Sequence, residues 1–181
     1  PGRQPINTVH RSESKRPQVM DFIKEEIANG RQVFVIYPLI EESSKVDYEN
    51  LMKGYEEVKS FFPEPKYWIS MVHGKMDAKQ KETNMQRFVK GETQIMVSTT
   101  VIEVGVNVPN ATVMVIESAE KFGLSQLHQL RGRVGRGAEK SFCILLTGPK
   151  VSNDARERLK IMVATNDGFK IAEKDLEIRG P

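Results

Sequence analysis

The sequence contains one cysteine, Cys143, among its 181 residues. A single cysteine cannot form an internal disulfide, and no cysteine–histidine spacing typical of a zinc site is present, so we expect no metal site. Cys143 lies within the apolar run Phe142–Leu146, which indicates a packing role in the core. This cysteine usage is typical of a protein from a reducing cytoplasm rather than of a disulfide-stabilised secreted module.

Long apolar runs are also missing. No run approaches the roughly 20 apolar residues that cross a bilayer, and no cationic-then-apolar export signal precedes the first helical pattern. We therefore expect a cytoplasmic protein without membrane contact.

The chain is 39% hydrophobic and 28% charged, which suits one domain with its own core, and its net charge of +3 is compatible with nucleic-acid binding without indicating it. Its abrupt ends at Pro1 and Pro181 suggest a fragment of a longer protein.

Apolar, β-branched runs alternate with amphipathic helical patterns along most of the chain. Runs without in–out alternation are typical of strands in a parallel sheet that is covered on both faces. The alternation of strand and helix therefore predicts an α/β fold with a doubly wound parallel sheet. The predicted strands are Gln32–Tyr37, Trp68–Val72, Gln94–Val97, Thr112–Ile116 and Ser141–Leu146.

Several residues mark where the predicted helices begin and end. Pro17 and Gly30 are placed to open and close the first helix. Asp47 is a candidate N-cap of the second. Asp77 and Gln80 form the spacing of a capping box before the third.

The pattern changes after Leu146. Two charged helical stretches, Asn153–Thr165 and Lys170–Leu176, follow without a further strand. We expect them to form a helical hairpin that packs beside the sheet, outside the α/β domain of residues 1–150.

The first candidate functional segment runs from Ser98 to Pro109, directly after a predicted buried strand. Ligands of open α/β sheets bind at the carboxyl ends of strands. The three consecutive hydroxyls of residues 98–100 can donate to phosphate oxygens there, and Gly105 allows close approach of a backbone. The structural alternative is a loop whose hydroxyls only cap a short helix.

The second candidate segment is Gln126–Gly137. Gln129, Gly132, Arg133 and Arg136 fall at i, i+3, i+4 and i+7, which places them on one stripe if the segment is helical. Two guanidinium groups and an amide beside glycine suit the presentation of planar donors to a phosphate chain. A solvated basic face is the alternative, although the glycines disfavour an ordinary surface helix.

Together the two segments resemble motifs V and VI of superfamily 2 helicases. Residues 129–136 read Gln-Leu-Arg-Gly-Arg-Val-Gly-Arg, similar to the family pattern Q-x-x-G-R-x-G-R, and residues 99–109 resemble T-x-x-x-x-x-G-x-D-x-P. Residues 98–105, 122–133 and 167–180 resemble the branch that contains the RecG helicases and the transcription-repair coupling factors. Residues 37–43 and the closing Arg179-Gly180-Pro181 are more similar to the RecG family, and the resemblance covers essentially the whole chain.

The resemblance implies a RecA-like fold and a place in a larger motor. Residues 1–150 would be the second RecA-like helicase domain with motifs IV, V and VI, and residues 151–181 the helical hairpin with the start of the translocation-motif loop. The parent would be an ATP-dependent DNA helicase that remodels branched DNA by fork reversal and Holliday-junction branch migration. It would be a bacterial, nucleoid-associated monomer acting on branched or duplex DNA. ATP with Mg²⁺ would be held mainly by the first helicase domain, and a wedge domain of the same chain would complete the protein.

The resemblance also implies residue roles. Arg133 and Arg136 match the arginine fingers, with Gln129 as the residue that orients them, and Gly105, Asn107 and Gly132 fall at nucleotide-facing positions. Ser98, Thr99 and Thr100 match DNA-contacting positions, as does Gly74 in a His73-Gly74 turn similar to motif IVa. Arg179 matches the arginine that couples ATP state to movement. Asn107 departs from the family's aspartate, because its amide accepts a hydrogen bond but carries no negative charge.

The chain lacks the phosphate cradle of an ATPase. It contains no G-x-x-x-x-G-K-[ST] sequence and no Asp-Glu pair at a strand end to hold magnesium. We therefore expect half of a motor, inactive in isolation. For His73 the structural alternative is that its side chain only satisfies a loop carbonyl. Two alternatives remain open for the whole: the motor domain of a transcription-repair coupling factor, and a stand-alone nucleic-acid-binding α/β module.

Overall fold

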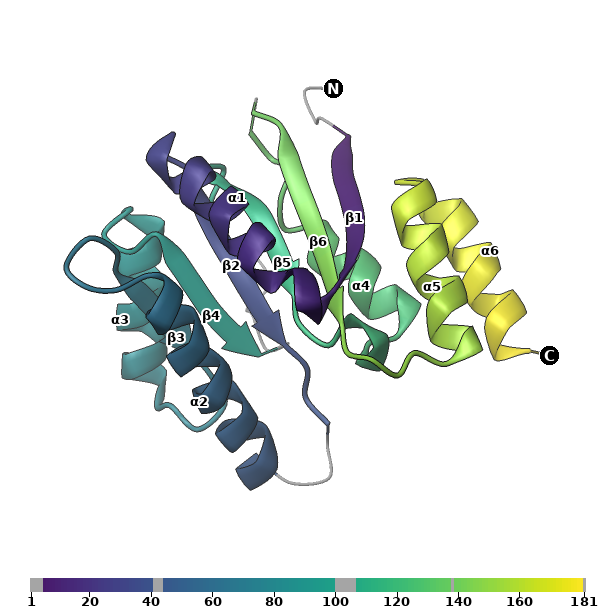
Figure 1. Cartoon of the computed structure of the whole chain (residues 1–181), viewed down its shortest axis with the longest axis horizontal. Coiled ribbons are helices and arrows are strands. Elements are labelled where there is room, and N and C mark those ends of the chain that lie inside the picture. The colour runs from purple at the N-terminus through teal and green to yellow at the C-terminus, as the bar shows by residue number, and fades with distance from the viewer. Residues whose placement is uncertain (1–4, 41–43, 100–106, 138, 181) are drawn as a thin grey trace.

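The computed structural model describes residues 5–40, 44–99, 107–137 and 139–180. Figure 1 shows a sheet with helices on both faces. The strands are β1 (Ile6–Ser12), β2 (Gln32–Tyr37), β3 (Ile69–Val72), β4 (Ile95–Thr99), β5 (Ala111–Ile116) and β6 (Ser141–Thr147). The helices are α1 (Arg16–Ala28), α2 (Ser44–Phe61), α3 (Ala78–Val89), α4 (Leu124–Arg131), α5 (Asn153–Ala164) and α6 (Gly168–Arg179).

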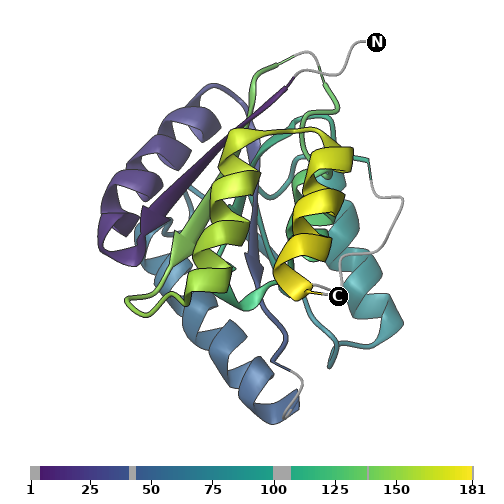
Figure 2. The ribbon, with the colours of Figure 1, turned by 90° about the vertical axis from the view of Figure 1, so that its right-hand side faces the viewer.

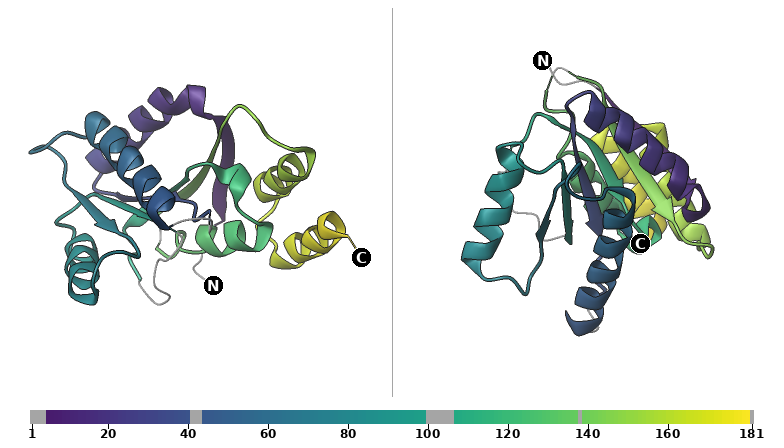
Figure 3. Two further views of the ribbon diagram at one scale, coloured as in Figure 1. Left: turned by 90° about the horizontal axis from the view of Figure 1, so that it is seen from below. Right: turned by 60° about the vertical axis from the view of Figure 1, so that its left-hand side comes forward.

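The six strands form one parallel sheet in the order β1-β6-β5-β2-β4-β3. α1 and α2 lie on one face of the sheet, and α3, α4 and α5 lie on the other (Figure 3). Their side chains form two hydrophobic clusters, one on each face. Every residue of β4 and β5 is buried, as the strands' lack of alternation predicted. The predicted doubly wound parallel sheet is confirmed.

The sequence pattern does not predict β1. Ile6 and Thr8 are buried, but Asn7 between them and the last two residues of the strand are exposed. β1 is an edge strand that pairs only with β6, from Ile6 opposite Ser141 to Ser12 opposite Thr147. Edge strands are often polar, so the local sequence reads as a loop until its distant partner is known.

The helix boundaries confirm most of the predicted caps. Pro17 lies in the first turn of α1, and Gly30 follows its end with a φ of +87°. In the capping box of α3, Asp77 Oδ1 accepts from the Gln80 amide at 2.8 Å and Gln80 Oε1 accepts from the Asp77 amide at 3.1 Å. The N-cap prediction for Asp47 was wrong: α2 begins three residues earlier, and the Asp47 carboxylate accepts from the Ile40 amide at 2.8 Å, which ties down the preceding loop.

α5 and α6 form the predicted helical hairpin and lie side by side (Figure 2). α5 also contacts β1, and α6 also contacts α4. The inner side chains Leu159, Met162 and Ile171 are buried in the same cluster as the leucines of α4. The hairpin is therefore distinct in sequence pattern, but its inner face continues the core of the α/β domain. Within the described residues, no helix is both long and apolar enough to span a membrane.

Candidate functional site

The parallel sheet has two chemically different edges. The carboxyl edge is formed by the last residues of the strands and the amino edge by their first residues. The carboxyl edge comprises Ser12, Tyr37, Val72, Thr99, Ile116 and Thr147, and the amino edge comprises Ile6, Gln32, Ile69, Ile95, Ala111 and Ser141.

The 132–137 segment, which contains both candidate finger arginines, follows α4 rather than continuing it. α4 ends at Arg131 with Gly132 as its C-cap. The amides of Arg133 and Val134 bond back only three residues, to the Leu130 and Arg131 carbonyls, which tightens the last turn. Gly135 then has a φ of +81°, which ends any helical path. The prediction of a single helical stripe was therefore wrong.

The 132–137 segment lies at the amino edge of the sheet. Gly137 approaches Pro109, just before β5, so closely that a Cβ on Gly137 would be 3.0 Å from the Pro109 carbonyl oxygen. The end of the first candidate segment, with exposed Asn107, is thus brought beside the end of the second. Arg133 is half-buried, whereas Arg136 is exposed and donates from Nε to the Gly132 carbonyl at 3.2 Å.

A small polar network holds this edge together. Arg31, at the start of β2, donates from Nη1 to Asn110 Oδ1 at 3.2 Å, and its Nη2 lies 3.1 Å from Glu139 Oε1. Asn110 in turn donates from Nδ2 to the Gly30 carbonyl at 2.8 Å. These contacts join the described approaches to β2, β5 and β6 through Arg31, Asn110 and Glu139.

Arg131 is the functional-site residue that the sequence analysis missed. Its side chain is only 2% exposed, and Nη1 donates to the Met162 carbonyl of α5 at 2.5 Å and to Thr8 Oγ1 of β1 at 3.2 Å. Burial lowers its pKa. The sequence did contain a signal for the burial of Arg131. Leu124, Leu127 and Arg131 fall at i, i+3 and i+7, which is the spacing of the buried stripe of α4. Arg131 therefore anchors the start of the 132–137 segment to the hairpin and to β1.

The structure also describes the surroundings of three other residues that were predicted to belong to the site. Gln129 lies exposed on α4, one turn before Arg133, and Gly132 is half-buried. Arg179 is exposed at the end of α6 and donates from Nη1 to Asp175 Oδ2 at 3.2 Å, one turn earlier. Among the described residues, no three histidine, cysteine or acidic side chains are placed to hold a metal ion.

The hydroxyls predicted to contact DNA lie at the carboxyl edge, at the end of β4. Ser98 and Thr99 are both buried, and Ser98 Oγ donates to the Thr99 carbonyl at 3.0 Å. Thr99 Oγ1 is buried without a hydrogen-bond partner in the described part of the chain. Thr100 and Gly105 lie outside the described residues. Of the hydroxyls predicted to contact DNA, Thr99 Oγ1 is thus the described one that has no partner among the described residues.

The His73-Gly74 turn follows β3 at the same edge. His73 is buried, its Nδ1 accepts from the Lys75 amide at 3.1 Å, and its ring meets Tyr48 edge-on at 5.0 Å. Burial, and then the charges of Lys81 and Lys75, lower its pKa. His73 therefore satisfies a loop amide rather than the carbonyl considered from the sequence. A Cβ on Gly74 would meet nothing within 4 Å, so the turn leaves open space there.

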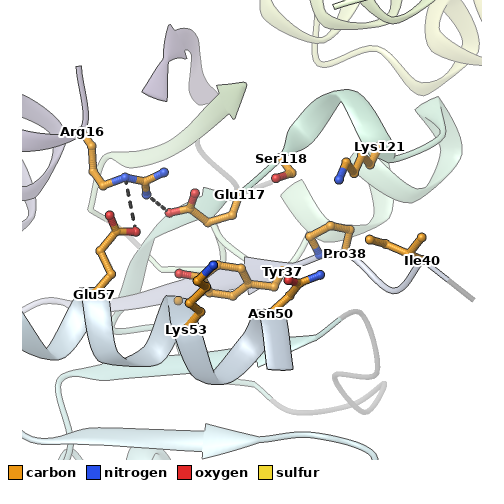
Figure 4. Close-up of a pocket in the computed structure, with 11 residues that line it drawn as sticks. Arg16, Tyr37, Pro38, Ile40, Asn50, Lys53, Glu57, Glu117, Ser118 and Lys121 are labelled. Carbon is orange, nitrogen blue, oxygen red and sulfur yellow. Dashed lines mark hydrogen bonds and ion pairs between the residues drawn. The ribbon is translucent and has the colours of Figure 1, made fainter. Parts of the chain in front are cut away.

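A charged cleft opens between the ends of β2 and β5 (Figure 4). α2 follows β2 on one face and α4 follows β5 on the other, which makes this the switch point where ligands of open α/β sheets bind. The cleft has a volume of about 430 Å³. Its lining includes Arg16, Tyr37, Asn50, Lys53, Glu57, Glu117, Ser118 and Lys121, of which the sequence analysis had singled out only the stretch beginning at Tyr37.

An ion pair forms the wall of this cleft. Arg16 from α1 binds Glu117, which follows β5, and its Nε lies 3.6 Å from Glu57 Oε1 of α2. Burial raises the pKa of Glu117 against the opposing effect of Arg16, and it also raises the pKa of Tyr37. The Tyr37 hydroxyl has no partner within the described residues, and a Cβ on Gly54 would overlap its ring. The carboxyl edge therefore presents several polar groups with unused hydrogen-bonding capacity.

A family model described as helicase conserved C-terminal domain matches residues 14–138. Two bacterial proteins named ATP-dependent DNA helicase RecG are similar over essentially all of the chain. The Synechocystis protein is 54% identical over 182 residues, covering 100% of this chain and 22% of its own length. The Bacillus subtilis protein is 50% identical over 180 residues, covering 99% of this chain and 26% of its own length. The chain thus spans about a quarter of these relatives.

Solved structures give the same relationship in three dimensions. The structure of RecG bound to a three-way DNA junction matches with a TM-score of 0.83 and 42% identity, over 100% of this chain and 23% of that one. Domain 2 of the DEAD-box helicase Mss116p, bound to an RNA duplex, matches with a TM-score of 0.64 over 94% of this chain and 67% of that one. At 17% identity the second match shows a shared fold alone. The RecA-like fold predicted from the sequence is confirmed.

Proposed function

The chain belongs to the family of helicase conserved C-terminal domains, and from this premise we propose that it is the second motor domain of an ATP-dependent DNA helicase that remodels branched DNA. The RecG relatives, at 54% and 50% identity, support the RecG assignment over a coupling-factor motor. The observation that carries the proposal is that the 132–137 segment, with Arg133 and Arg136, packs through Gly137 against Pro109, two residues after Asn107, in a chain without a phosphate cradle. The parent acts as a monomer in the bacterial cytoplasm, at the nucleoid.

The amino edge supplies the arginine fingers. ATP with Mg²⁺ is held mainly by the first motor domain, and Arg133 and Arg136 reach it across the interdomain cleft. A guanidinium keeps its charge at any physiological pH and offers planar donors to the γ-phosphate oxygens, where charge builds up in the transition state. Asn107 faces the same nucleotide and accepts through its amide oxygen. The hydrogen bonds of Arg131 to β1 and α5 hold the start of the 132–137 segment in place.

The carboxyl edge contacts duplex DNA. Thr99 Oγ1, buried and unpartnered among the described residues, is a donor for a backbone phosphate, and the open space at Gly74 admits a second. Ser98, Thr100 and Gly105 belong to the same motif. Contacts of this kind read no base sequence, and their strength falls steeply with salt because bound counterions are released.

The test of this assignment is the loss of each finger in the full-length parent. Arg133→Ala and Arg136→Ala should each lower kcat for ATP by roughly 10³-fold, the scale of a lost arginine finger, while the dissociation constant for DNA stays near the wild-type value. Arg156→Ala, an exposed arginine on α5, is the matched control and should keep wild-type turnover. Turnover near wild type in either finger variant would refute that arginine's role. The isolated chain should show no ATPase activity.

The hairpin transmits the ATP state to the DNA. Met162 of α5 receives the Arg131 hydrogen bond, and Ile171 of α6 packs in the α4 cluster, so a displacement of α4 moves both helices. Arg179, at the end of α6, is the coupling residue. Arg179→Ala in the parent should keep most DNA-stimulated ATPase activity and raise the ATP consumed per fork converted. A ratio equal to that of wild type and of the Arg156→Ala control would remove the coupling role.

A further inference from the structure

α6 carries apolar side chains on two opposite faces. On its inner face Ile171 is 3% exposed and packs into the core cluster shared with α4 and α5. On the opposite face Phe169 is 85% exposed and Leu176 is 69% exposed. They are seven residues apart, so they lie one above the other, with exposed Ala172 between them. We refer to Phe169, Ala172 and Leu176 as the outer stripe of α6.

The outer stripe differs from ordinary scattered surface hydrophobics. The other exposed large apolar side chains among the described residues are 40% to 45% exposed, whereas both members of the stripe are far more exposed and share one face. A helix that is apolar on both faces is typical of a helix buried between two layers. α6 lies at the outer end of the molecule, with α5 and α4 beside its inner side (Figures 1 and 3). One of its two expected layers is therefore outside the described structure.

We propose that the outer stripe docks an apolar segment of the same polypeptide, from outside these 181 residues. The small area of the outer stripe favours a segment of the same polypeptide over a separate molecule. Complete covering of a phenylalanine and a leucine buries roughly 300 Å², whereas a stable interface needs about 800 Å² per partner. A tethered segment needs far less contact, because its effective concentration reaches the millimolar range. The curated relatives are about four times longer than the chain, so the polypeptide that can supply the segment exists in them.

The charged residues beside the outer stripe indicate which side chains the docked segment should carry. Glu173 and Glu177 are exposed on one flank, next to Phe169 and Leu176 on the helical wheel. Glu177 already pairs with Lys174, at 3.5 Å, whereas no ion pair of Glu173 is recorded within the described residues. On the other flank Arg179 is paired with Asp175. The docked segment is therefore apolar, with a lysine or arginine placed to meet Glu173. This inference uses the size of the relatives and not the roles of Arg133 and Arg136, so each can fail without the other.

Thiol labelling in the full-length parent tests the proposal. Phe169→Cys and Leu176→Cys are compared with Val89→Cys, which lies on α3 at 41% exposure. The native thiol adds no background, because Cys143 is buried and burial raises its pKa to about 12, which leaves almost no reactive thiolate. Other cysteines of the parent are replaced beforehand. Without DNA, cysteines at 169 and 176 should react with a disulfide reagent at least about 10-fold more slowly than the control, at nanomolar and at micromolar protein.

Three outcomes would overturn the proposal: labelling as fast as the control, protection that develops only as protein concentration rises, and protection that develops only when DNA is added. The second would assign the stripe to another copy of the chain, and the third to DNA. A photo-crosslinking amino acid in place of Phe169 gives an independent measurement. The expected product joins residue 169 to a peptide outside residues 1–181 of the same molecule, at monomer mass. Crosslinks to a second copy, to DNA or to no peptide would each contradict the docking.

Discussion

At the amino edge of the sheet Arg31 contacts Asn110 and Glu139, and Arg131 donates from Nη1 to two oxygens, whereas Arg131 Nη2 and Thr112 Oγ1 have no partner among the described residues. At the carboxyl edge, the Thr99 and Tyr37 hydroxyls are buried with no partner among the described residues. A strand of six residues rises about 20 Å, so the two edges are that far apart.

The two kinds of edge suit two different tasks: one holds a side chain in a fixed position, and the other offers groups that can still form hydrogen bonds. An arginine that must meet one phosphate oxygen gains from a backbone held on both sides, because misplacement by about 1 Å can cost roughly 10²-fold in rate. A surface that follows a moving DNA backbone gains from groups whose hydrogen bonds are still to be made. The contacts of Arg31 and Arg131 at the amino edge fit the first requirement, and the unpartnered Thr99 and Tyr37 hydroxyls at the carboxyl edge fit the second.

Among the changes that test the difference between the edges, the largest expected effect concerns the close packing at the amino edge. Gly137→Val would push a side chain against the Pro109 carbonyl and displace the 132–137 segment. In the parent, kcat for ATP should fall roughly 10²-fold, with DNA affinity unchanged. Gly74→Ala is the control from the other edge, where a Cβ meets nothing within 4 Å, and its kcat at saturating DNA should stay at the wild-type level. Equal kcat in the two variants would show that the edges do not differ in this way.

The next effect concerns the buried anchor. Arg131→Met removes the donor to the Met162 carbonyl and to Thr8 Oγ1, leaving two buried acceptors without it. The free energy of unfolding, measured by urea denaturation of the chain, should fall by about 2 kcal/mol. Arg156→Met, on the exposed side of α5, should change it by less than about 0.5 kcal/mol. An unchanged stability in the Arg131 variant would show that the buried guanidinium costs as much as its hydrogen bonds contribute.

A smaller effect separates two neighbouring hydroxyls at the carboxyl edge. Thr99→Val keeps the shape of the side chain but removes the unpartnered hydroxyl, and the affinity for duplex DNA should fall by about 10-fold, the worth of one hydrogen bond to a charged group. Ser98→Ala should leave affinity almost unchanged, because that hydroxyl already donates to the Thr99 carbonyl. Fluorescence anisotropy at fixed salt measures both. The reverse order of effects would contradict the assignment of Thr99.

The smallest effect is a pH dependence at the same edge. Burial lowers the pKa of His73 below its ordinary value of 6.5, so the unfolded chain binds a proton more readily than the folded one. The stability that the neutral ring contributes is present above pH 6.5 and is lost as pH falls through the lowered pKa. The facing charges are Lys75 and Lys81, which act in the same direction. His73→Gln should flatten this part of the curve, and identical slopes in urea denaturation from pH 7 to pH 5 would exclude it.

Local sequence was sufficient for the elements whose signals are local. The buried runs of β2, β4 and β5 and the Asp77 capping box are determined by neighbouring residues, and the structure confirms them. β1 was missed because its burial comes from β6, more than 130 positions later. No property of residues 6–12 alone distinguishes that strand from a polar loop.

The sequence predicted which residues would form the candidate site, a prediction that still awaits its test, but it did not predict their conformation. The arginine pattern located the 132–137 segment, yet Gly132 keeps helical angles and the left-handed backbone comes only at Gly135, so the sequence could not show where α4 ends. The sequence analysis did not single out Arg131, because its burial requires α5 and β1 to be in place. The switch-point cleft likewise joins Arg16 to Glu117, 101 positions apart.

The pairing of β1 with β6 has a consequence for synthesis of the protein. β1 leaves the ribosome before the other strands of this sheet, but its neighbour among the described strands, β6, begins at Ser141, 135 positions after Ile6. At about 5–20 residues per second, β1 waits on the order of 10 s for that partner. Throughout this interval the backbone donors and acceptors that later pair with β6 lack that partner. The polar composition that hid β1 from sequence analysis, with exposed Asn7, Arg11 and Ser12, is the same property that lets the strand wait in solution without aggregating.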